Sequence, residues 1–347
     1  MSSCASNSPG RCVNDNLEPV QVAAEPVKQR TVQHVTATRS PDAVEFLRVS
    51  TGSDETAAAV VSAFATWDEV RSAGVATLMR YGVSAVAAQT LINTPTPPPV
   101  SGYGRVVTKY TMTYPPGVRD LPSPPIALYV KGTLPEGPAV LIAGSAVPSP
   151  IGVEVAKAAA DAVNAVGATA LWVAEEGVGM AAGLSLDPAR SIMVVPHGLD
   201  VPSPVGYAAE RVLAGGGAVV SAFSSGVGMS VANLESSYKL GAAWAECVLL
   251  AEFSVLPSGG LVAAQTAVSL DRAIVVPERV HDSAEAAPIQ HMTVAGADTL
   301  TTRDVLDTQL YPGGSRAYTR STQGLTPADY VVSSTRQLRE VLAHLLT

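Results

Sequence analysis

Residues 139–152 read Ala-Val-Leu-Ile-Ala-Gly-Ser-Ala-Val-Pro-Ser-Pro-Ile-Gly, an apolar run that ends in a turn rich in glycine, serine and proline. The run is apolar at every position, as expected for a strand that is buried on both faces. Residues 153–166 follow with apolar side chains at helical spacing. A buried strand that leads through such a turn into a helix predicts the first unit of a parallel α/β sheet.

The same alternation of strand and helix continues along the chain. Further strands are expected at 168–174, 191–196, 218–223, 247–253 and 273–277, and helices at 179–186, 205–213, 233–246 and 260–270. A closing strand and helix are expected within 328–346, where Ser334 or Thr335 suits a helix cap. We therefore predict an α/β fold, a Rossmann-like doubly wound parallel sheet with its core at 139–277.

The sequence also predicts a division into domains. Residues 1–39 are polar and are expected to form a disordered tail, whereas residues 40–92 predict a small N-terminal helical domain that starts at Ser40-Pro41-Asp42. Residues 93–104 contain Thr-Pro-Thr-Pro-Pro-Pro and predict a stiff proline linker. The Rossmann-like domain then covers 105–347, with an irregular insertion at about 283–325.

Composition and charge limit the classes of function. The three cysteines lie at positions 4, 12 and 247 without metal-like spacing, so neither a disulfide framework nor a metal site is expected. The sequence shows no secretion signal and no apolar run long enough to span a membrane, which predicts a cytoplasmic protein. The formal net charge is −8, whereas a nucleic-acid-binding protein usually presents a basic patch.

The loop after the first strand of the core is a candidate anion site. In such sheets, ligands bind beyond the carboxyl ends of the strands, where helix N-termini present free backbone amides. Gly144, Ser145, Ser149 and Gly152 supply hydroxyls and space for close approach there. The loop matches neither the dinucleotide-binding nor the P-loop pattern. A turn needed only for tight packing explains the same residues equally well.

Several individual polar residues also allow both a binding role and a structural one. Lys239 after Tyr238 would suit a phosphate beside a stacked base, or else a solvated helix face. Glu252 at a strand end would suit a ribose hydroxyl, or else the cap of the helix that starts near Ser258. Three further features are more typical of solvated or inert side chains: the pair Glu175 and Glu176, His197, and a basic lip at Arg316 and Arg320.

An ordered series of motifs then points to a family. The series consists of Tyr114 to Gly132 (with Leu-Tyr-x-x-Gly), Val140-Leu-Ile-Ala-Gly-Ser145, His197-Gly-Leu-Asp200, Gly217 to Phe223, Val248 to Glu252 with Ser258-Gly-Gly-Leu261, and Tyr330 to Leu342. In this order and spacing it resembles the DprA/Smf family of DNA-processing proteins. The resemblance implies a Rossmann-like fold that binds single-stranded DNA, forms a homodimer and helps to load a recombinase during DNA uptake or repair. It implies no cofactor and no catalytic residues.

The chain departs from the family pattern at charged positions. Ala146 stands where the family has an arginine, and Glu176, Gly179 and Gly183 replace an arginine, an aspartate and a histidine. An Arg-Asn-Arg element falls on 237–239, which leaves Lys239 as its one cation. Residues 139–277 contain five basic and eleven acidic side chains. Each lost phosphate contact weakens DNA binding.

Two other functions stay open from the sequence. One is the binding or processing of a nucleotide or another small phosphorylated ligand in a neutral pocket, and the other is a structural or interaction role. An enzyme is the less favoured interpretation, because no catalytic constellation is visible. The ligand- or phosphate-binding residues predicted for either binding function are Gly144, Ser145, Ser149, Gly152, Gly177, Gly179, Ser224, Lys239, Glu252, Ser258, Gly259 and Gly260.

Overall fold

The computed structural model describes residues 36–100, 104–252, 259–277, 329–332 and 334–347. The chain from Val35 onward belongs to one compact unit. In the described residues, no helix is long and apolar enough to cross a bilayer.

Between residues 36 and 100, the structure has five short helices: α1 (Pro41–Thr51), α2 (Asp54–Ala63), α3 (Trp67–Ser72), α4 (Val75–Met79) and α5 (Ala85–Asn93). Four of them begin at a residue whose hydroxyl accepts a hydrogen bond from a first-turn amide, namely Ser40, Ser53, Thr66 and Ser84. Residues before the boundary expected at residue 40 also pack with these helices, because Ala37 forms an antiparallel bridge with Thr66 and Thr38 is buried.

The helices α1–α5 share their core with the first two strands. Val44, Leu47 and Trp67 lie in one apolar cluster with Ile126 and Tyr129. The proline-rich segment after α5 also contacts these helices, since the amide of Val100 donates a hydrogen bond to Asp42 of α1 at 2.8 Å. The division of the chain into domains itself stays a prediction.

The described strands form one nine-stranded sheet in the order β1-β2-β6-β5-β4-β3-β7-β8-β9. Their bounds are β1 (Arg105–Thr108), β2 (Ala127–Gly132), β3 (Ala139–Ala143), β4 (Thr169–Val173), β5 (Ser191–Val195), β6 (Ala218–Ser221), β7 (Cys247–Leu250), β8 (Ala273–Pro277) and β9 (Tyr330–Val332). From β6 to β9 in this order, all pairs are parallel, so the predicted Rossmann-like α/β sheet is confirmed.

Two antiparallel strands at one edge were not predicted as part of the sheet. β1 pairs antiparallel with β2, and β2 pairs antiparallel with β6. The segment between β1 and β2 contains only the short 3-10 helix η1 (Pro116–Asp120), so it does not make the helical crossover that a parallel pair needs. An antiparallel edge on an otherwise parallel sheet is common in this fold class.

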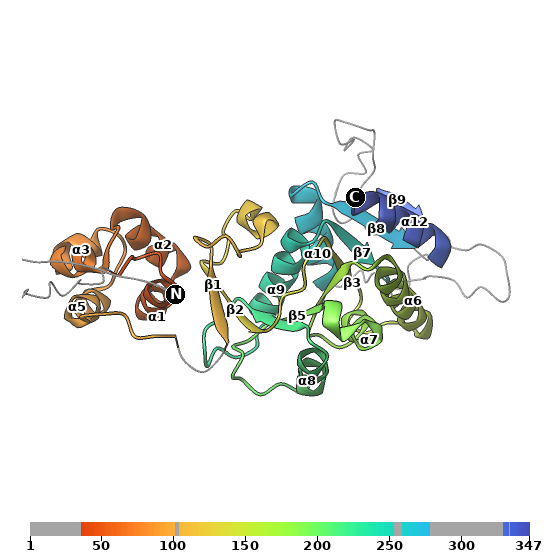
Figure 1. Ribbon diagram of the computed structural model, residues 1–347, viewed down its shortest axis with the longest axis horizontal. Helices are drawn as coiled ribbons and strands as arrows, with labels where there is room; N and C mark the ends of the chain where they lie inside the picture. Colours follow the sequence, from red (N-terminus) through yellow and green to blue (C-terminus); the bar gives the residue numbers. More distant parts are fainter. Residues whose placement is uncertain (1–35, 101–103, 253–258, 278–328, 333) are drawn as a thin grey trace, which may run out of the picture. The chain divides into compact units, whose positions relative to one another are not determined.

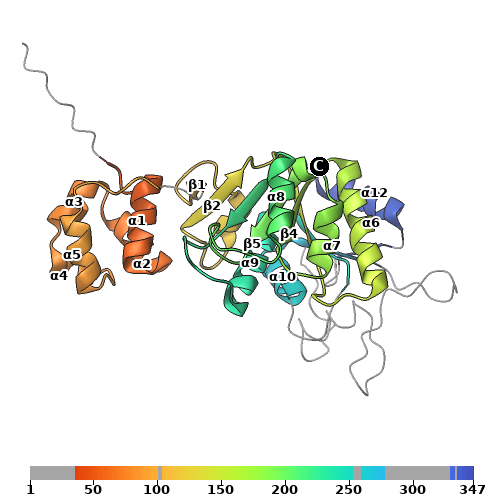
Figure 2. The same ribbon diagram turned by 90° about the horizontal axis from the view of Figure 1, so that it is seen from below.

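Helices cover both faces of the sheet. α6 (Pro150–Val166), α7 (Val178–Ser185), α8 (Gly206–Ala214) and α12 (Thr335–Leu345) pack on one face, as Figure 2 shows for α6 and α7. α9 (Val231–Trp244) and α10 (Gly259–Ser269) lie side by side on the other (Figure 1). Strand β3 serves both cores, because Leu141 faces α9 and α10 while Val140 and Ile142 face α6.

The strand order fixes where the sheet changes direction. From β3 the chain proceeds through β4, β5 and β6 to one side, and it then returns to place β7 and β8 on the other side of β3. The carboxyl ends of β3 and β7 therefore border the topological switch point. In open α/β sheets this is the usual place for a ligand.

Candidate nucleic-acid interface

The switch point brings together two residues predicted from distant parts of the sequence, Ser149 and Glu252. Ser149 is the N-cap of α6, and its hydroxyl accepts a hydrogen bond from the amide of Gly152 at 3.0 Å. Glu252 follows β7, and its carboxylate accepts from the Ser149 amide at 3.0 and 3.1 Å and from the Ser149 hydroxyl. The protein thus places its own carboxylate at the helix end, where an anion is most favourable.

The neighbouring residues are packed tightly around this contact. A Cβ at Gly152 would overlap the Glu252 carboxylate, so only glycine leaves room for it. Ser145 is buried, its amide donates to the Glu252 carbonyl at 2.9 Å, and its carbonyl accepts from Val178 at 3.0 Å. A Cβ at Gly144 would overlap the same Glu252 carbonyl. The phosphate-binding role of these residues stays a prediction.

The other predicted glycines also lie where chain segments meet closely. Gly177 has a φ of +98°, and a Cβ there would overlap the backbone of Ser145 and Ala146. A Cβ at Gly179 would approach the carbonyl oxygen of Val173 at 2.8 Å. Gly259 lies against the ring of Tyr238, and Gly260 against the backbone of Gly144. These glycines permit the close approach of α7 and α10 to the sheet.

Ser224 occupies a different position from the switch-point residues. Its hydroxyl lies 2.9 Å from the hydroxyl of Tyr129 on β2, and Tyr129 also donates to Glu45 of α1. Burial raises the pKa of both Glu45 and Tyr129 above their ordinary values. Ser224 thus connects the loop after β6 with α1.

Lys239 lies where two cavities adjoin between α9 and α10. Both are lined by Lys239, Thr266 and Ser269, with volumes of about 500 and 610 Å³. The smaller extends to Arg48, Ser123 and Ser236, and the larger to Glu175, Gln265 and the apolar Leu234 and Val262. We call the two together the α9–α10 groove. The Lys239 side chain is exposed and forms no hydrogen bond or ion pair within the described residues.

Tyr238 does not lie in the groove beside Lys239. Its side chain is only 1% exposed, so a base cannot stack on the ring in this structure, and the expectation of stacking is wrong. Its hydroxyl donates instead to Glu175 at 2.6 Å. Burial raises the pKa of Glu175, and the hydrogen bond from Tyr238 offsets part of that rise. Glu176 is exposed, so the two adjacent acids diverge as expected.

The remaining predicted residues contribute no described contact to the groove. His197 is 6% exposed; its Nδ1 lies 2.9 Å from the Gly198 carbonyl and its Nε2 has no partner in the described residues. Its carbonyl accepts from the buried Ser221 hydroxyl at 2.7 Å. Ser258, Arg316, Arg320 and the expected insertion at 283–325 lie outside the described residues.

Three serine or threonine residues of the groove were missed by the sequence interpretation, namely Ser236, Thr266 and Ser269. Ser236 and Lys239 are three residues apart on α9, and Thr266 and Ser269 are three apart on α10. That spacing places each pair on one helix face, which was a visible signal. Arg48 had no such signal. Its guanidinium pairs with Asp54 at 2.7 Å and donates to the Tyr129 hydroxyl at 3.1 Å and to the Ala222 carbonyl.

The sequence matches a known protein family over most of the sheet. The model of the family described as DNA recombination-mediator protein A matches residues 105–309, which is more than half of the chain. The chain belongs to this family. A search among curated protein sequences gave no significant match.

Two solved structures share the fold of this DNA recombination-mediator protein A family member. DNA processing protein A from Helicobacter pylori, described for its single-stranded DNA binding mode, is 17% identical, with a TM-score of 0.53, over 71% of this chain and 99% of that chain. DNA processing protein A (DprA) from Streptococcus pneumoniae is 16% identical, with a TM-score of 0.54, over 70% of this chain and 88% of that chain. At these identities the likeness establishes the shared fold.

This family member departs from the DprA/Smf motif series at two places for which the structure gives a reason. A Cβ at Gly183 would overlap the buried indole of Trp172, so a histidine does not fit there. Within the triplet 237–239, Ser237 and Tyr238 are buried and only Lys239 is exposed. The Ser237 hydroxyl donates to the Asn233 carbonyl at 3.0 Å. This part of α9 therefore presents a single cation.

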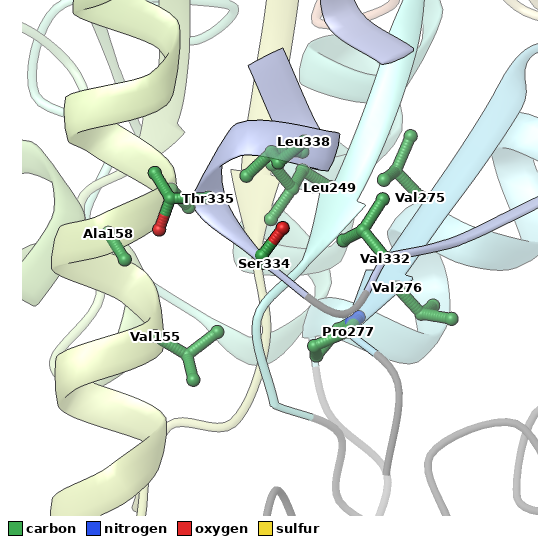
Figure 3. A pocket seen from close by; sticks show the side chains of 11 residues that line it. Val155, Ala158, Leu249, Val275, Val276, Pro277, Val332, Ser334, Thr335 and Leu338 are labelled. Atoms are coloured by element: carbon green, nitrogen blue, oxygen red, sulfur yellow. The ribbon is translucent and has the colours of Figure 1, made fainter. Parts of the chain in front are cut away.

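A third cavity of this family member lies away from the groove, between α6, α12 and the strands β7 to β9 (Figure 3). Its volume is about 190 Å³. Apart from Ser334 and Thr335, its lining is apolar, with Val155, Leu249 and Leu338 among the side chains. Such a lining suits neither a phosphate nor the edge of a base. The cavity is therefore no candidate for nucleic acid.

Proposed function

We propose that the chain binds single-stranded DNA along the α9–α10 groove and acts as a DNA recombination mediator. The observation that carries this proposal is the exposed Lys239 at the junction of two cavities. An unpaired ammonium in a continuous groove is suited to a backbone phosphate. Membership of the family and the single-stranded DNA binding mode described for the H. pylori relative support the same function.

The lining of the groove suits a single strand better than a duplex. The exposed Ser123 hydroxyl offers a hydrogen bond to a phosphate oxygen, and Leu234 and Val262 offer apolar surface to unstacked bases. Arg48 also lines the groove, but its charge is compensated by Asp54. Lys239 is thus left as the one uncompensated cation among the described lining residues.

The alternative of a small phosphorylated ligand at the switch point receives less support. The Glu252 carboxylate lies at the N-terminus of α6 and uses the Ser149 amide and hydroxyl that a phosphate would need. A phosphate beside it would meet like charge and lose these donors. A recombinase partner and a homodimer are proposed with the function, on the family resemblance.

A salt titration with single-stranded DNA tests the proposed function. If one phosphate contact releases counterions from the strand, a plot of the logarithm of the association constant against the logarithm of the salt concentration should have a slope of about −0.7. Lys239→Met should flatten the slope and weaken binding at low salt. Lys157→Met is the matched control, since Lys157 is exposed on α6 and already pairs with Glu154 at 2.8 Å. Absence of binding by the parent at low salt, or an unchanged slope in Lys239→Met, would overturn the proposal.

A further inference from the structure

Glu175 is a fixed hydrogen-bond acceptor in the wall of the α9–α10 groove. It follows β4, and its Oε2 accepts from the hydroxyl of the buried Tyr238 at 2.6 Å. Tyr238 is itself held in place, because Gly259 packs directly against its ring. No second hydrogen bond to the carboxylate is present in the described residues. Lone pairs of Oε1 and the second lone pair of Oε2 thus remain for a ligand.

An ionised carboxylate accepts hydrogen bonds and donates none, which discriminates among the bases. Guanine presents two adjacent N–H donors on its Watson–Crick edge, N1–H and the N2 amino group, which match the two oxygens of a carboxylate. Thymine presents one N–H donor between two carbonyl oxygens, and these would face the carboxylate unfavourably. Unstacked bases of a single strand are read on this edge.

The rest of the larger cavity is compatible with a nucleotide unit. Its volume of about 610 Å³ exceeds what a single base needs, and Leu234 and Val262 supply apolar walls for the base. Lys239 lines the same cavity and supplies a cation for the attached phosphate. Glu235 also lines the cavity, but it is exposed on α9 and has no hydrogen bond within the described residues.

We propose that this cavity is a guanine subsite, in which Glu175 accepts from the Watson–Crick edge of the base and Tyr238 positions Glu175. The proposal rests on the proposed function, because it assigns base preference to the same groove. A preference for guanine is not implied by the family resemblance, and binding of single-stranded DNA does not require it. Guanine can reach the cavity in a DNA strand or as a free nucleotide, and the experiment separates these two sources.

The experiment compares an all-thymine oligonucleotide with the same strand that carries one central guanine. Fluorescence anisotropy should show about tenfold tighter binding of the guanine strand, the discrimination expected of one bidentate contact. Glu175→Gln should remove or invert this preference, since its amide group donates where the carboxylate accepted. Tyr238→Phe should reduce the preference, because Glu175 loses the bond that fixes it. Glu176→Gln is the control, since Glu176 is exposed next to Glu175 and lines neither cavity of the groove, and it should leave the ratio of the two affinities unchanged.

A second measurement uses free nucleotides. The melting temperature of the full chain is compared in guanosine monophosphate and in thymidine monophosphate. Stabilisation by the guanine nucleotide alone, lost in Glu175→Gln, supports the subsite even if the oligonucleotides fail to bind. Failure of both oligonucleotides to bind counts against the DNA function. Equal affinity for the two strands together with no nucleotide discrimination overturns the guanine subsite and leaves DNA binding intact.

Discussion

The carboxylate of Glu252 accepts hydrogen bonds from both the backbone amide and the hydroxyl of Ser149. The two residues connect the carboxyl end of β7 with the N-terminus of α6, across the switch point of the sheet. A side chain of the protein thus takes the position that a bound anion occupies in many nucleotide-binding sheets. We therefore propose that the contact combines a structural role with the exclusion of phosphate.

Glu252→Gln should lower the free energy of unfolding by about 1–2 kcal/mol, since the helix end loses a charge-assisted hydrogen bond. The variant should also gain stabilisation from added inorganic phosphate, because the helix end no longer carries a negative charge that repels it. Thermal unfolding with and without phosphate measures both effects. Glu154→Gln is the control on the same helix, because Glu154 is exposed, and it should change stability by less than about 0.5 kcal/mol. An equal phosphate effect in parent and variant would contradict the interpretation.

Gly259→Ala should be among the more damaging single substitutions in this chain. The added methyl group would overlap the ring of the buried Tyr238, and overpacking of this kind costs about 1–3 kcal/mol. Urea unfolding followed by circular dichroism gives the loss. Gly228→Ala provides the comparison, because a Cβ at Gly228 meets nothing within 4 Å. Similar stabilities for the two variants would show that the Tyr238 ring yields easily.

Arg48→Met should destabilise the junction between α1 and the sheet. The Arg48 side chain is 13% exposed, and its removal leaves Asp54 without its ion-pair partner and the Ala222 carbonyl without a donor, and it removes one of the hydrogen bonds to the Tyr129 hydroxyl. Loss of one partner from such a largely buried pair costs about 3 kcal/mol. Arg336→Met, in an exposed i,i+4 pair with Glu340, should cost less than about 0.5 kcal/mol in the same denaturation experiment. If the two variants lose equal free energies of unfolding, Arg48 does not hold α1 against the sheet.

The stability of the chain should carry a pH signature from Glu175. Its pKa is raised by burial in the folded state, so the folded protein holds this proton more tightly than the unfolded chain. This contribution is present below the ordinary pKa of 4.5 and is lost as the pH rises through the folded pKa. Glu175→Gln cannot lose a proton there, so its stability relative to the parent should increase as the pH rises across that window. Urea titrations at several pH values measure this difference, and parallel curves for the two proteins would refute it.

The sequence was sufficient for much of the fold because its signals are local. Ser149 followed by Pro150 defines the start of α6, and Ser334 caps α12 as expected. The apolar runs gave the central strands to within a few residues, since a strand buried on both faces has little freedom of composition. The antiparallel pairing of β1 and β2 carried no comparable signal, because it depends on which sheet edge is available.

The contacts within the candidate site were not predictable from the sequence for a different reason. Ser149 and Glu252 are separated by 103 positions, and Glu175 and Tyr238 by 63. Each residue was visible as the end of a strand or the face of a helix, but its partner depends on the strand order. Tyr238 was expected beside Lys239 in a binding surface, yet adjacent residues on a helix face different directions. Burial decides which of the two can meet a ligand.

The pairing of β8 with β9 has a consequence for the synthesis of the chain. Residues 278–329 separate the two strands in sequence, so β8 presents an unpaired edge on the ribosome until residues 330–332 have emerged. Until α12 follows, the face of α6 against which it packs also stays uncovered. Closure of so distant a contact is slow compared with local helix formation. A chaperone that shields exposed strand edges would therefore act on this protein after β8 has emerged and before β9 and α12 follow, at β8 and α6.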